Sequence, residues 1–252
     1  MNKGHEKIRG REFLKDTIRL QMDFSQTDQS RGFPAPPVQK PFDEDKKRIE
    51  LTPVDALQND IQVDLTKAIA DRVSHRKFKD EALSLQELSY LLWSTQGVRG
   101  SRRAGSVLRT VPSAGCRHAF ETYLCVFNVE QLTTGIYRYL PLEHQLILEF
   151  EETALDQKIG VATLGQFFTG RCAVTFVWTA LPHRMEWRYG EASYKVIALD
   201  AGHVCQNLYL ACSAVGSGTC AIAAYNQEIM DALLKVDGTD EFVVYLAPVG
   251  KV

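Results

Sequence analysis

The residues from 186 to 215 contain the longest helical pattern in the chain, and this pattern limits the possible folds more than any other feature. No proline interrupts the stretch, and apolar residues recur at intervals of three and four, the spacing of one helical stripe: Ile197, Ala201, Val204, Leu208, Ala211 and Val215. The opposite face is only weakly polar. We therefore predict a helix of roughly 45 Å that is buried on two sides, at the centre of the fold or of a dimer interface.

Helical and strand patterns alternate along the rest of the folded region. Ser84 and Glu87 have the spacing of a capping box, which predicts a helix over 84–96. Three short segments rich in aromatic and branched residues predict an antiparallel meander: 120–129, 135–140 and 145–150. The other predicted elements are helices over 153–168 and 226–235, a central strand over 172–180 and a final strand over 241–249. The fold class is therefore α+β, with a mixed sheet between helices.

Composition excludes several classes of protein. The 252 residues are 45% hydrophobic, enough for a sizeable core, and 29 basic against 31 acidic residues leave a net charge of -2. Such a chain lacks the counterion-release drive of a nucleic-acid binder, so we expect no nucleic-acid partner. No apolar run reaches the roughly 18 residues of a membrane span, and the amino terminus lacks a signal-like apolar stretch. We expect a soluble, cytoplasmic protein with no membrane partner, whose six cysteines are reduced.

Residues 1–60 differ from the rest of the chain, and we interpret them as a charged arm that precedes a folded domain over 61–252. Four prolines lie close together in the arm and favour extended or polyproline geometry: Pro34, Pro36, Pro37 and Pro41. Two interpretations remain open. The arm is either a loosely tethered tail or a segment that packs along the body or along a second subunit.

Some familiar motifs are absent or lie in the wrong context. Residues 216–221 match a dinucleotide-binding pattern, but these glycines end the long helix, whereas a Rossmann turn connects a strand to a helix. Gly216 is better explained as a left-handed helix stop. Cys116 and His118 have no second pair at ligand spacing, so we predict no metal site.

Arg72, Ser74 and Arg76 form the constellation with the clearest chemistry. Because they alternate, all three side chains leave an extended segment on one side. Two guanidiniums that flank a hydroxyl are suited to bind a phosphate and a second acceptor. The alternative is a solvated basic stretch that starts a helix.

Three further pieces support a site for a flat, phosphorylated ligand. Residues 109–115 and 218–223 consist largely of small residues, whose backbone can approach a ring closely, although each alone is only a turn or a loop. Lys251 adds a cation beside the flexible Gly250.

Taken in this order, the pieces resemble the FMN-dependent nitroreductase superfamily over residues from about 65 to 251. The closer resemblance is to the SagB-type branch, named for oxidases that dehydrogenate azoline rings in modified peptides to thiazoles and oxazoles. The blocks that carry it are LSLQELSYLLWSTQGV, RTVPSAGCRH, ETYLCVFNVE, GIYRYLP, YKVIALDAGHVCQNLYLA and GTCAIAAYNQ, followed by YLAPVGK.

This resemblance implies a nitroreductase-like fold with a mainly antiparallel sheet, and a homodimer with two FMN sites that are each built by both subunits. One subunit is expected to contact the flavin phosphate, ribityl chain and pyrimidine edge through Arg72, Ser74 and Arg76, with Gln166 near that edge and Lys251 near the phosphate. The loop residues Ala221, Ile222 and Ala223 of the same subunit are expected to face flavin N5. The other subunit is expected to supply Pro112, Ser113 and Ala114. An Asn usually follows this last turn in the family, where this chain has Cys116.

Tyr194 and Lys195 resemble the Tyr and Lys positions that assist proton removal in the peptide oxidases. A lysine serves as a base only if burial lowers its pKa. The alternative is an ordinary pair on an amphipathic helix, with a lysine that extends to solvent. His118 and His203 are expected to be structural.

The resemblance implies an FMN-dependent oxidoreductase that transfers hydride at flavin N5 in a ping-pong cycle, from NAD(P)H to a small acceptor such as a nitroaromatic or a quinone. One alternative is a SagB-type dehydrogenase that oxidises azolines to azoles in a modified peptide. The other, from a different class, is a non-catalytic flavin-fold binding protein.

Overall fold

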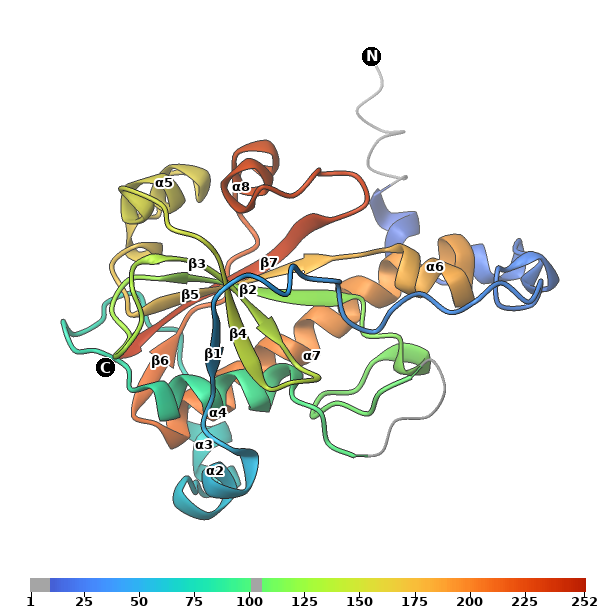
Figure 1. The fold of residues 1–252 in the computed structure, drawn as a ribbon. Helices are drawn as coiled ribbons and strands as arrows, with labels where there is room; N and C mark the ends of the chain where they lie inside the picture. The colour runs from blue at the N-terminus through green and yellow to red at the C-terminus, as the bar shows by residue number, and fades with distance from the viewer. Residues whose placement is uncertain (1–9, 101–105) are drawn as a thin grey trace.

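The meander predicted over 120–150 forms the middle of a seven-stranded sheet in the computed structural model, which describes residues 10–100 and 106–252 (Figure 1). The strands are β1 (Arg48–Glu50), β2 (Phe120–Val126), β3 (Gly135–Leu140), β4 (Gln145–Phe150), β5 (Val174–Ala180), β6 (Ser217–Thr219) and β7 (Phe242–Lys251). Their order is β1-β4-β3-β2-β5-β7-β6, and neighbouring strands pair antiparallel. The predicted mixed sheet is therefore antiparallel in all these strands. A parallel bridge between Leu83 and Val129 lies outside them.

Helices cover both faces of this sheet, as predicted for an α+β fold (Figure 1). They are α2 (Val54–Asp60), α3 (Leu65–Asp71), α4 (Leu85–Gln96), α5 (Leu155–Ala162), α6 (His183–Tyr189), α7 (Ser193–Ala214) and α8 (Gln227–Leu234). α5 and α8 lie on one face, and α4 and α7 lie on the other. Across the described ranges, no helix has both the length and the hydropathy that a bilayer crossing requires.

The strand predicted to be central, β5, is buried along its whole length between β2 and β7. Phe176 and Trp178 belong to the core shared with α4 and α7, whereas Val177 belongs to the core under α5 and α8. Successive side chains of a strand point to opposite faces, so an apolar run can fill both cores at once. This explains why the strand is apolar at nearly every position.

The long helical pattern is divided between α6 and α7, so the prediction of one uninterrupted helix is wrong. α7 spans 22 residues, or about 33 Å. The break lies at Gly190, whose φ of 49° is left-handed and favours glycine. A Cβ at this position would lie 2.5 Å from the Met22 side chain, because the arm packs against the break. The sequence pattern does not predict this helix end, because the end depends on a contact with a distant segment.

The arm from Met22 to residue 60 packs along the body, so a loosely tethered tail does not describe this part of it. β1 joins the sheet beside β4. The Arg109 guanidinium donates to the carbonyl of Val38 (2.7 Å), and Trp187 donates its indole N–H to the carbonyl of Phe33 (3.0 Å). The division of the chain at residue 60 remains a prediction.

A buried ion network holds the arm against the sheet. Glu121 on β2 is 2% exposed, accepts a hydrogen bond from the Lys40 backbone N–H (2.8 Å) and forms an ion pair with Arg184 (2.5 Å). Arg138 lies 3.6 Å from the same carboxylate and donates to the carbonyls of Lys40 and Pro41. Burial alone would raise the pKa of Glu121, but the charges of Arg184 and Arg138 hold it below its ordinary value.

Candidate functional site

The segment after α3 starts no helix; it is extended, as required for its alternating side chains to leave on one side, and it runs along the sheet edge formed by β6 and the end of β7. The His75 backbone N–H donates to the carbonyl of Thr219 (2.9 Å), and that of Lys79 donates to the carbonyl of Lys251 (2.9 Å). The His75 ring covers Gly218, where a Cβ would lie 2.5 Å from it. Glycine is therefore required at this position for the segment to reach the edge.

Tyr209 on α7 connects this segment to the loop after β6. Its hydroxyl lies 2.9 Å from Ser74 Oγ and accepts a hydrogen bond from the Ala221 backbone N–H (2.8 Å). The Arg72 guanidinium lies over its ring, 5.4 Å from the centroid. Sequence reasoning missed Tyr209. The available signal was a hydroxyl-bearing side chain at a largely apolar helix position twelve residues before the loop.

Of the three loop amides predicted to face a ligand, two are already engaged. The Ala221 N–H donates to Tyr209, and the Ile222 N–H donates to the carbonyl of Leu246 (2.8 Å). In the part of the chain that the structure describes, no hydrogen bond is found for the Ala223 N–H. Gln166 supports the loop by donating to the carbonyl of Ala224 (3.0 Å). Ala223 is therefore the loop position best able to bind a ligand through its backbone.

The predicted basic residues differ in whether an acidic side chain already pairs with them. Lys251 pairs with Glu87 on α4 and donates to the carbonyl of Val215 (2.9 Å). Within residues 10–100 and 106–252, neither Arg72 nor Arg76 has an acidic partner. The two arginines are therefore the cations available to an anionic ligand, and the charge of Lys251 is already compensated.

The turn containing Pro112, Ser113 and Ala114 lies against a different part of α7. Asp200 is 4% exposed and accepts hydrogen bonds from the Ala114 backbone N–H (3.2 Å) and from the Ser113 hydroxyl. Burial raises the pKa of Asp200, and these two hydrogen bonds oppose the shift. Nine helix positions, about 13.5 Å of axis, separate Asp200 from Tyr209. Within one chain the turn is thus held away from the arginine segment.

The backbone that follows this turn is unusual. Gly115, Cys116 and His118 have φ values of 59°, 54° and 48°, and left-handed backbone is costly for residues other than glycine. A Cβ on Gly115 would lie 2.7 Å from the Tyr189 hydroxyl. His118 is buried, and burial followed by the charge of Arg109 lowers its pKa to about 3, so its ring is neutral. Strain of this kind persists where surrounding contacts hold a functional shape.

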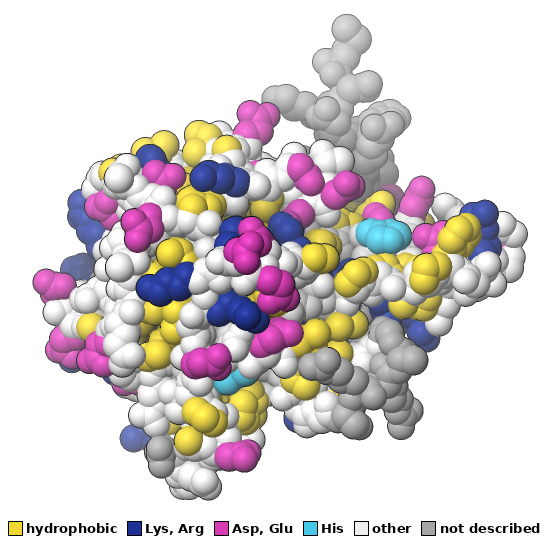
Figure 2. Space-filling model, viewed as in Figure 1, with side chains coloured by type: hydrophobic (Ala, Val, Ile, Leu, Met, Phe, Trp, Pro, Cys, Tyr) yellow, Lys and Arg dark blue, Asp and Glu magenta, His cyan; other side chains and the backbone are white. Residues whose placement is uncertain are grey.

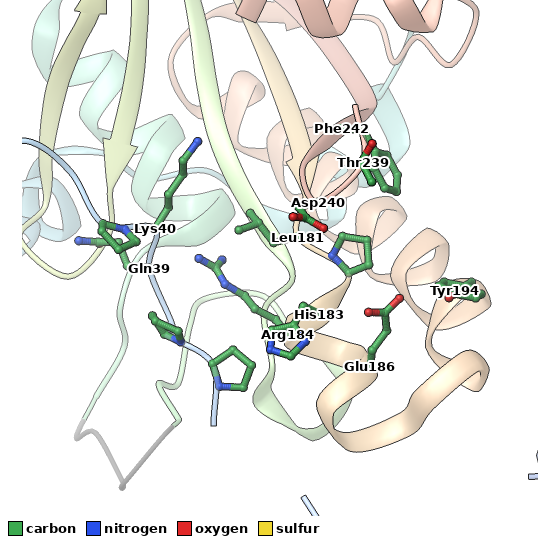
Figure 3. Close-up of a pocket in the computed structure, with 14 residues that line it drawn as sticks. Gln39, Lys40, Leu181, His183, Arg184, Glu186, Tyr194, Thr239, Asp240 and Phe242 are labelled. Atoms are coloured by element: carbon green, nitrogen blue, oxygen red, sulfur yellow. The ribbon is translucent and has the colours of Figure 1, made fainter. Parts of the chain in front are cut away.

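Two adjoining clefts open beside the start of α7. The inner cleft, about 420 Å³, is lined by residues that include Tyr194, Ala198, Gly202, Ala223 and Phe242. The outer cleft, about 570 Å³, lies between the arm and α6 and shares Tyr194 and Phe242 with the inner one. Figure 3 shows the outer cleft, with the arm residues Gln39 and Lys40 on one side and Tyr194 on the other. The surface view in Figure 2 shows hydrophobic side chains gathered toward α6.

The structure separates the two predicted catalytic residues. Partial burial and a hydrogen bond with Glu186 raise the pKa of Tyr194, which keeps its phenol protonated at neutral pH. Lys195 lines neither cleft and lies near the arm, where its charge helps Arg19 to lower the pKa of Asp16. Tyr194 therefore faces the space available to a ligand, whereas Lys195 does not.

Comparison with known proteins agrees with this geometry. The family model "Nitroreductase family" matches residues 69–251. A candidate nitroreductase of Methanocaldococcus jannaschii is 29% identical over 190 residues, which cover 75% of this chain and 92% of that protein. The trifolitoxin-processing protein TfxB of Rhizobium leguminosarum bv. trifolii is 27% identical over 154 residues, which cover 60% of this chain and 41% of TfxB.

Solved structures share the fold. A candidate nitroreductase of Ralstonia eutropha JMP134 has a TM-score of 0.68 at 24% identity, covering 87% of this chain and 97% of that one. A chain of the E. coli microcin synthetase McbBCD complex, solved with truncated pro-MccB17 bound, has a TM-score of 0.58 at 19% identity, covering 81% and 84%. A Desulfovibrio desulfuricans candidate nitroreductase in complex with FMN has a TM-score of 0.52 at 16% identity, covering 75% and 86%. Because the family model spans residues 69–251, this chain belongs to the nitroreductase family and is an oxidoreductase of that family.

Proposed function

We propose that the protein is an FMN-dependent oxidoreductase with a ping-pong cycle, in which a donor reduces the bound cofactor and leaves before an acceptor is reduced. The observation that carries this proposal is the junction at Tyr209. There the segment bearing Arg72 and Ser74 meets the loop that ends at the unengaged amide of Ala223. One side of this junction suits a phosphate and the other suits the edge of a ring.

The residues present fit FMN. Arg72 and Arg76 offer guanidiniums without acidic partners in the described ranges, and Ala223 offers a backbone donor at the wall of the inner cleft. When bound there, FMN would supply reversible hydride transfer at its N5 atom. Arg76 would lie at the pyrimidine edge and stabilise the negative charge that arrives with a hydride, while Arg72 would hold the phosphate.

The remaining predicted contacts support this arrangement. Ser74 would donate to an oxygen of the cofactor, and Gln166 would hold the loop near the pyrimidine edge through Ala224. Lys251 would add positive potential near the phosphate while remaining paired with Glu87.

A second copy of the chain would complete the site. Pro112, Ser113 and Ala114 are bonded near Asp200, too far along α7 to reach the arginine segment of their own chain, so we propose that they act in a homodimer. Apolar side chains without cover in the single chain suit such an interface: Val63, Leu65, Ile69 and Val73 around α3, and Leu199 on α7. Burial of Leu199 by the partner would also meet the sequence prediction that α7 is buried on two sides. Light scattering of the purified protein tests this dimer.

FMN binding gives the direct test of the proposal. The purified protein should be yellow, and quenching of flavin fluorescence measures its affinity. The double substitution Arg72→Ala and Arg76→Ala should weaken binding at least 100-fold, because it removes two charge-assisted contacts of about 1.5–3 kcal/mol each. Arg48→Ala is the matched control, since β1 and β6 form opposite edges of the sheet. Equal affinity of the double variant and the control would contradict the proposal.

Turnover separates the catalytic proposal from a flavin-fold binding protein. We propose NAD(P)H as donor and a nitroaromatic or quinone as acceptor, because the two adjoining clefts, of about 420 and 570 Å³, have the size of small-molecule sites beside the proposed flavin position. Anaerobic titration with NADH and then with NADPH should reduce the bound flavin with saturation. Parallel lines in double-reciprocal plots with a quinone would support the ping-pong cycle. A flavin that neither nicotinamide reduces would favour the non-catalytic alternative or a different donor.

A second candidate function is dehydrogenation of azoline rings in a modified peptide, as in the SagB-type branch. The observation that favours it is the continuity of the two clefts at Tyr194, which provides room for a chain on either side of a ring. Tyr194, whose phenol stays protonated at neutral pH, is placed to donate a hydrogen bond or deliver a proton beside that ring, and the position of Lys195 near Asp16 gives it a lesser part. Mass spectrometry of an azoline-containing peptide should detect the loss of two hydrogen atoms per ring, and Tyr194→Phe should slow this loss.

A further inference from the structure

Tyr209 contacts both the extended segment after α3 and the loop after β6. Its ring packs at the margin of the core between α7 and the sheet, its hydroxyl is shared between Ser74 and Ala221, and Arg72 lies over its face. These partners come from the extended segment and from the loop, which are separated by more than 140 residues of sequence. One side chain therefore connects the two halves of the proposed FMN site, beside the backbone hydrogen bonds of His75 and Lys79.

The donor fixes the direction of one of the two hydrogen bonds at the Tyr209 hydroxyl. A backbone N–H only donates, so the Tyr209 oxygen is the acceptor in its bond with Ala221. In the contact of 2.9 Å between the Tyr209 hydroxyl and Ser74 Oγ, either oxygen can donate. When Tyr209 donates, Ser74 accepts and keeps its own hydroxyl hydrogen for a further partner. Ser74 is exposed, and no such partner is found within residues 10–100 and 106–252.

We propose that Tyr209 is a positioning residue that makes the Ser74 hydroxyl a donor to an acceptor oxygen of the bound FMN. This inference rests on the proposed function and adds a residue and a direction to it. The chain of donors runs from the Ala221 N–H to Tyr209, from Tyr209 to Ser74 and from Ser74 to the ligand. Without the phenol hydroxyl, the Ser74 hydrogen is no longer directed outward and the loop loses one of its backbone contacts.

Tyr209→Phe is the sharpest perturbation, because it keeps the ring and its contact with Arg72 while removing both hydrogen bonds. We expect the Kd for FMN to rise about tenfold. Ser74→Ala should have a similar effect, and the loss in the double variant should be smaller than the sum of the two single losses, because both changes act on the same donor. Tyr90→Phe is the matched control, since Tyr90 is half-buried on α4 and no hydrogen bond of its hydroxyl is found in the described residues.

Amide exchange of the FMN-free protein provides a readout that does not depend on the cofactor. The Ala221 amide should exchange faster in Tyr209→Phe than in the wild type, while amides in the middle of β5 should not change. Affinity of Tyr209→Phe equal to that of the wild type, or full addition of the two losses in the double variant, would overturn the inference. A wild-type protein that binds no FMN would instead overturn the proposed function and the Ser74 donor role, while the exchange of Ala221 would still report its bond to Tyr209.

Discussion

Replacing Asp200 by alanine should weaken FMN binding by releasing the turn at Pro112–Ala114 from α7. The buried carboxylate accepts from the Ala114 N–H (3.2 Å) and is bonded by the Ser113 side chain. Hydrogen bonds to a charged group contribute about 1.5–3 kcal/mol each. At the lower of these values, loss of one or both hydrogen bonds predicts an affinity lower by about 10- to 100-fold. The helix itself should tolerate the change, because alanine has the higher helix propensity.

The assay exploits the proposal that each site takes this turn from one chain and its arginines from the other. Fluorescence titration of FMN gives the affinity of Asp200→Ala alone. The variant is then co-expressed with Arg72→Ala/Arg76→Ala in equal amounts. Half of the resulting dimers should contain one chain of each variant. In such a dimer, one site should combine the substituted arginines with the released turn, and the other site should have neither change. About a quarter of all sites should therefore bind with wild-type affinity, although neither parent does.

Two outcomes would refute this reasoning. Wild-type affinity of Asp200→Ala would mean that the turn does not need the carboxylate. A titration of the mixture equal to the average of its two parents would mean that turn and arginines act within one chain. Glu228→Ala is the matched control, because this exposed acid lies on α8 at the other face of the sheet; alone it should bind FMN with wild-type affinity, and in the same mixture about half of all sites should do so.

Three further predictions concern the framework of the site. Glu121→Ala leaves Arg184 buried without its carboxylate partner and should lower the free energy of unfolding by about 3–5 kcal/mol, or Tm by roughly 6–20 °C. A Tm within about 2 °C of the wild-type value would argue against a stabilising ion network. His118 has a folded pKa of about 3 against an ordinary 6.5, so protonation of the unfolded chain should remove about 2 kcal/mol of stability between pH 7 and pH 5, and urea unfolding of His118→Asn should lack this loss. Gly190→Ala should lower the free energy of unfolding by about 1–3 kcal/mol, because of the positive φ at this position and the contact with Met22. Adding Met22→Ala should restore the stability lost to the steric contact but not the stability lost to backbone strain. No restoration would show that the whole loss comes from the backbone.

Local patterns predicted the elements well because their causes are local. The helix over 84–96 appears as α4, with Ser84 Oγ accepting from the Glu87 N–H (3.2 Å) and the Glu87 carboxylate accepting from the Ser84 N–H (2.9 Å). The meander appears as β2, β3 and β4, and Gly216 is left-handed (φ 61°) at the end of α7 as predicted. Capping, strand propensity and glycine backbone freedom each act over a few residues, so the sequence alone exposes them.

Long-range contacts account for what the sequence did not reveal. The stop at Gly190 depends on Met22, and the compensation of Lys251 depends on Glu87, 164 residues away. Tyr194 and Lys195 are neighbours on α7, whose geometry turns them about 100° apart, and the tertiary structure places Asp16 near the lysine and the clefts at the tyrosine. No pattern within one segment carries information of this kind.

The sequence by itself determined the α+β class and most element positions, because residue type and spacing decide which side chains share a face and which backbones can bend. The residues that it assigns to a phosphorylated flavin remain a prediction. Only the tertiary structure decided which of those groups are available. It placed Tyr209 between Ser74 and Ala221, left the amide of Ala223 unengaged in the described chain, and put the Ser113 turn on a different part of α7 from the arginines. A hydrogen-bond donor or a charge is available only where no distant segment has already bonded it, and folding alone brings those segments together.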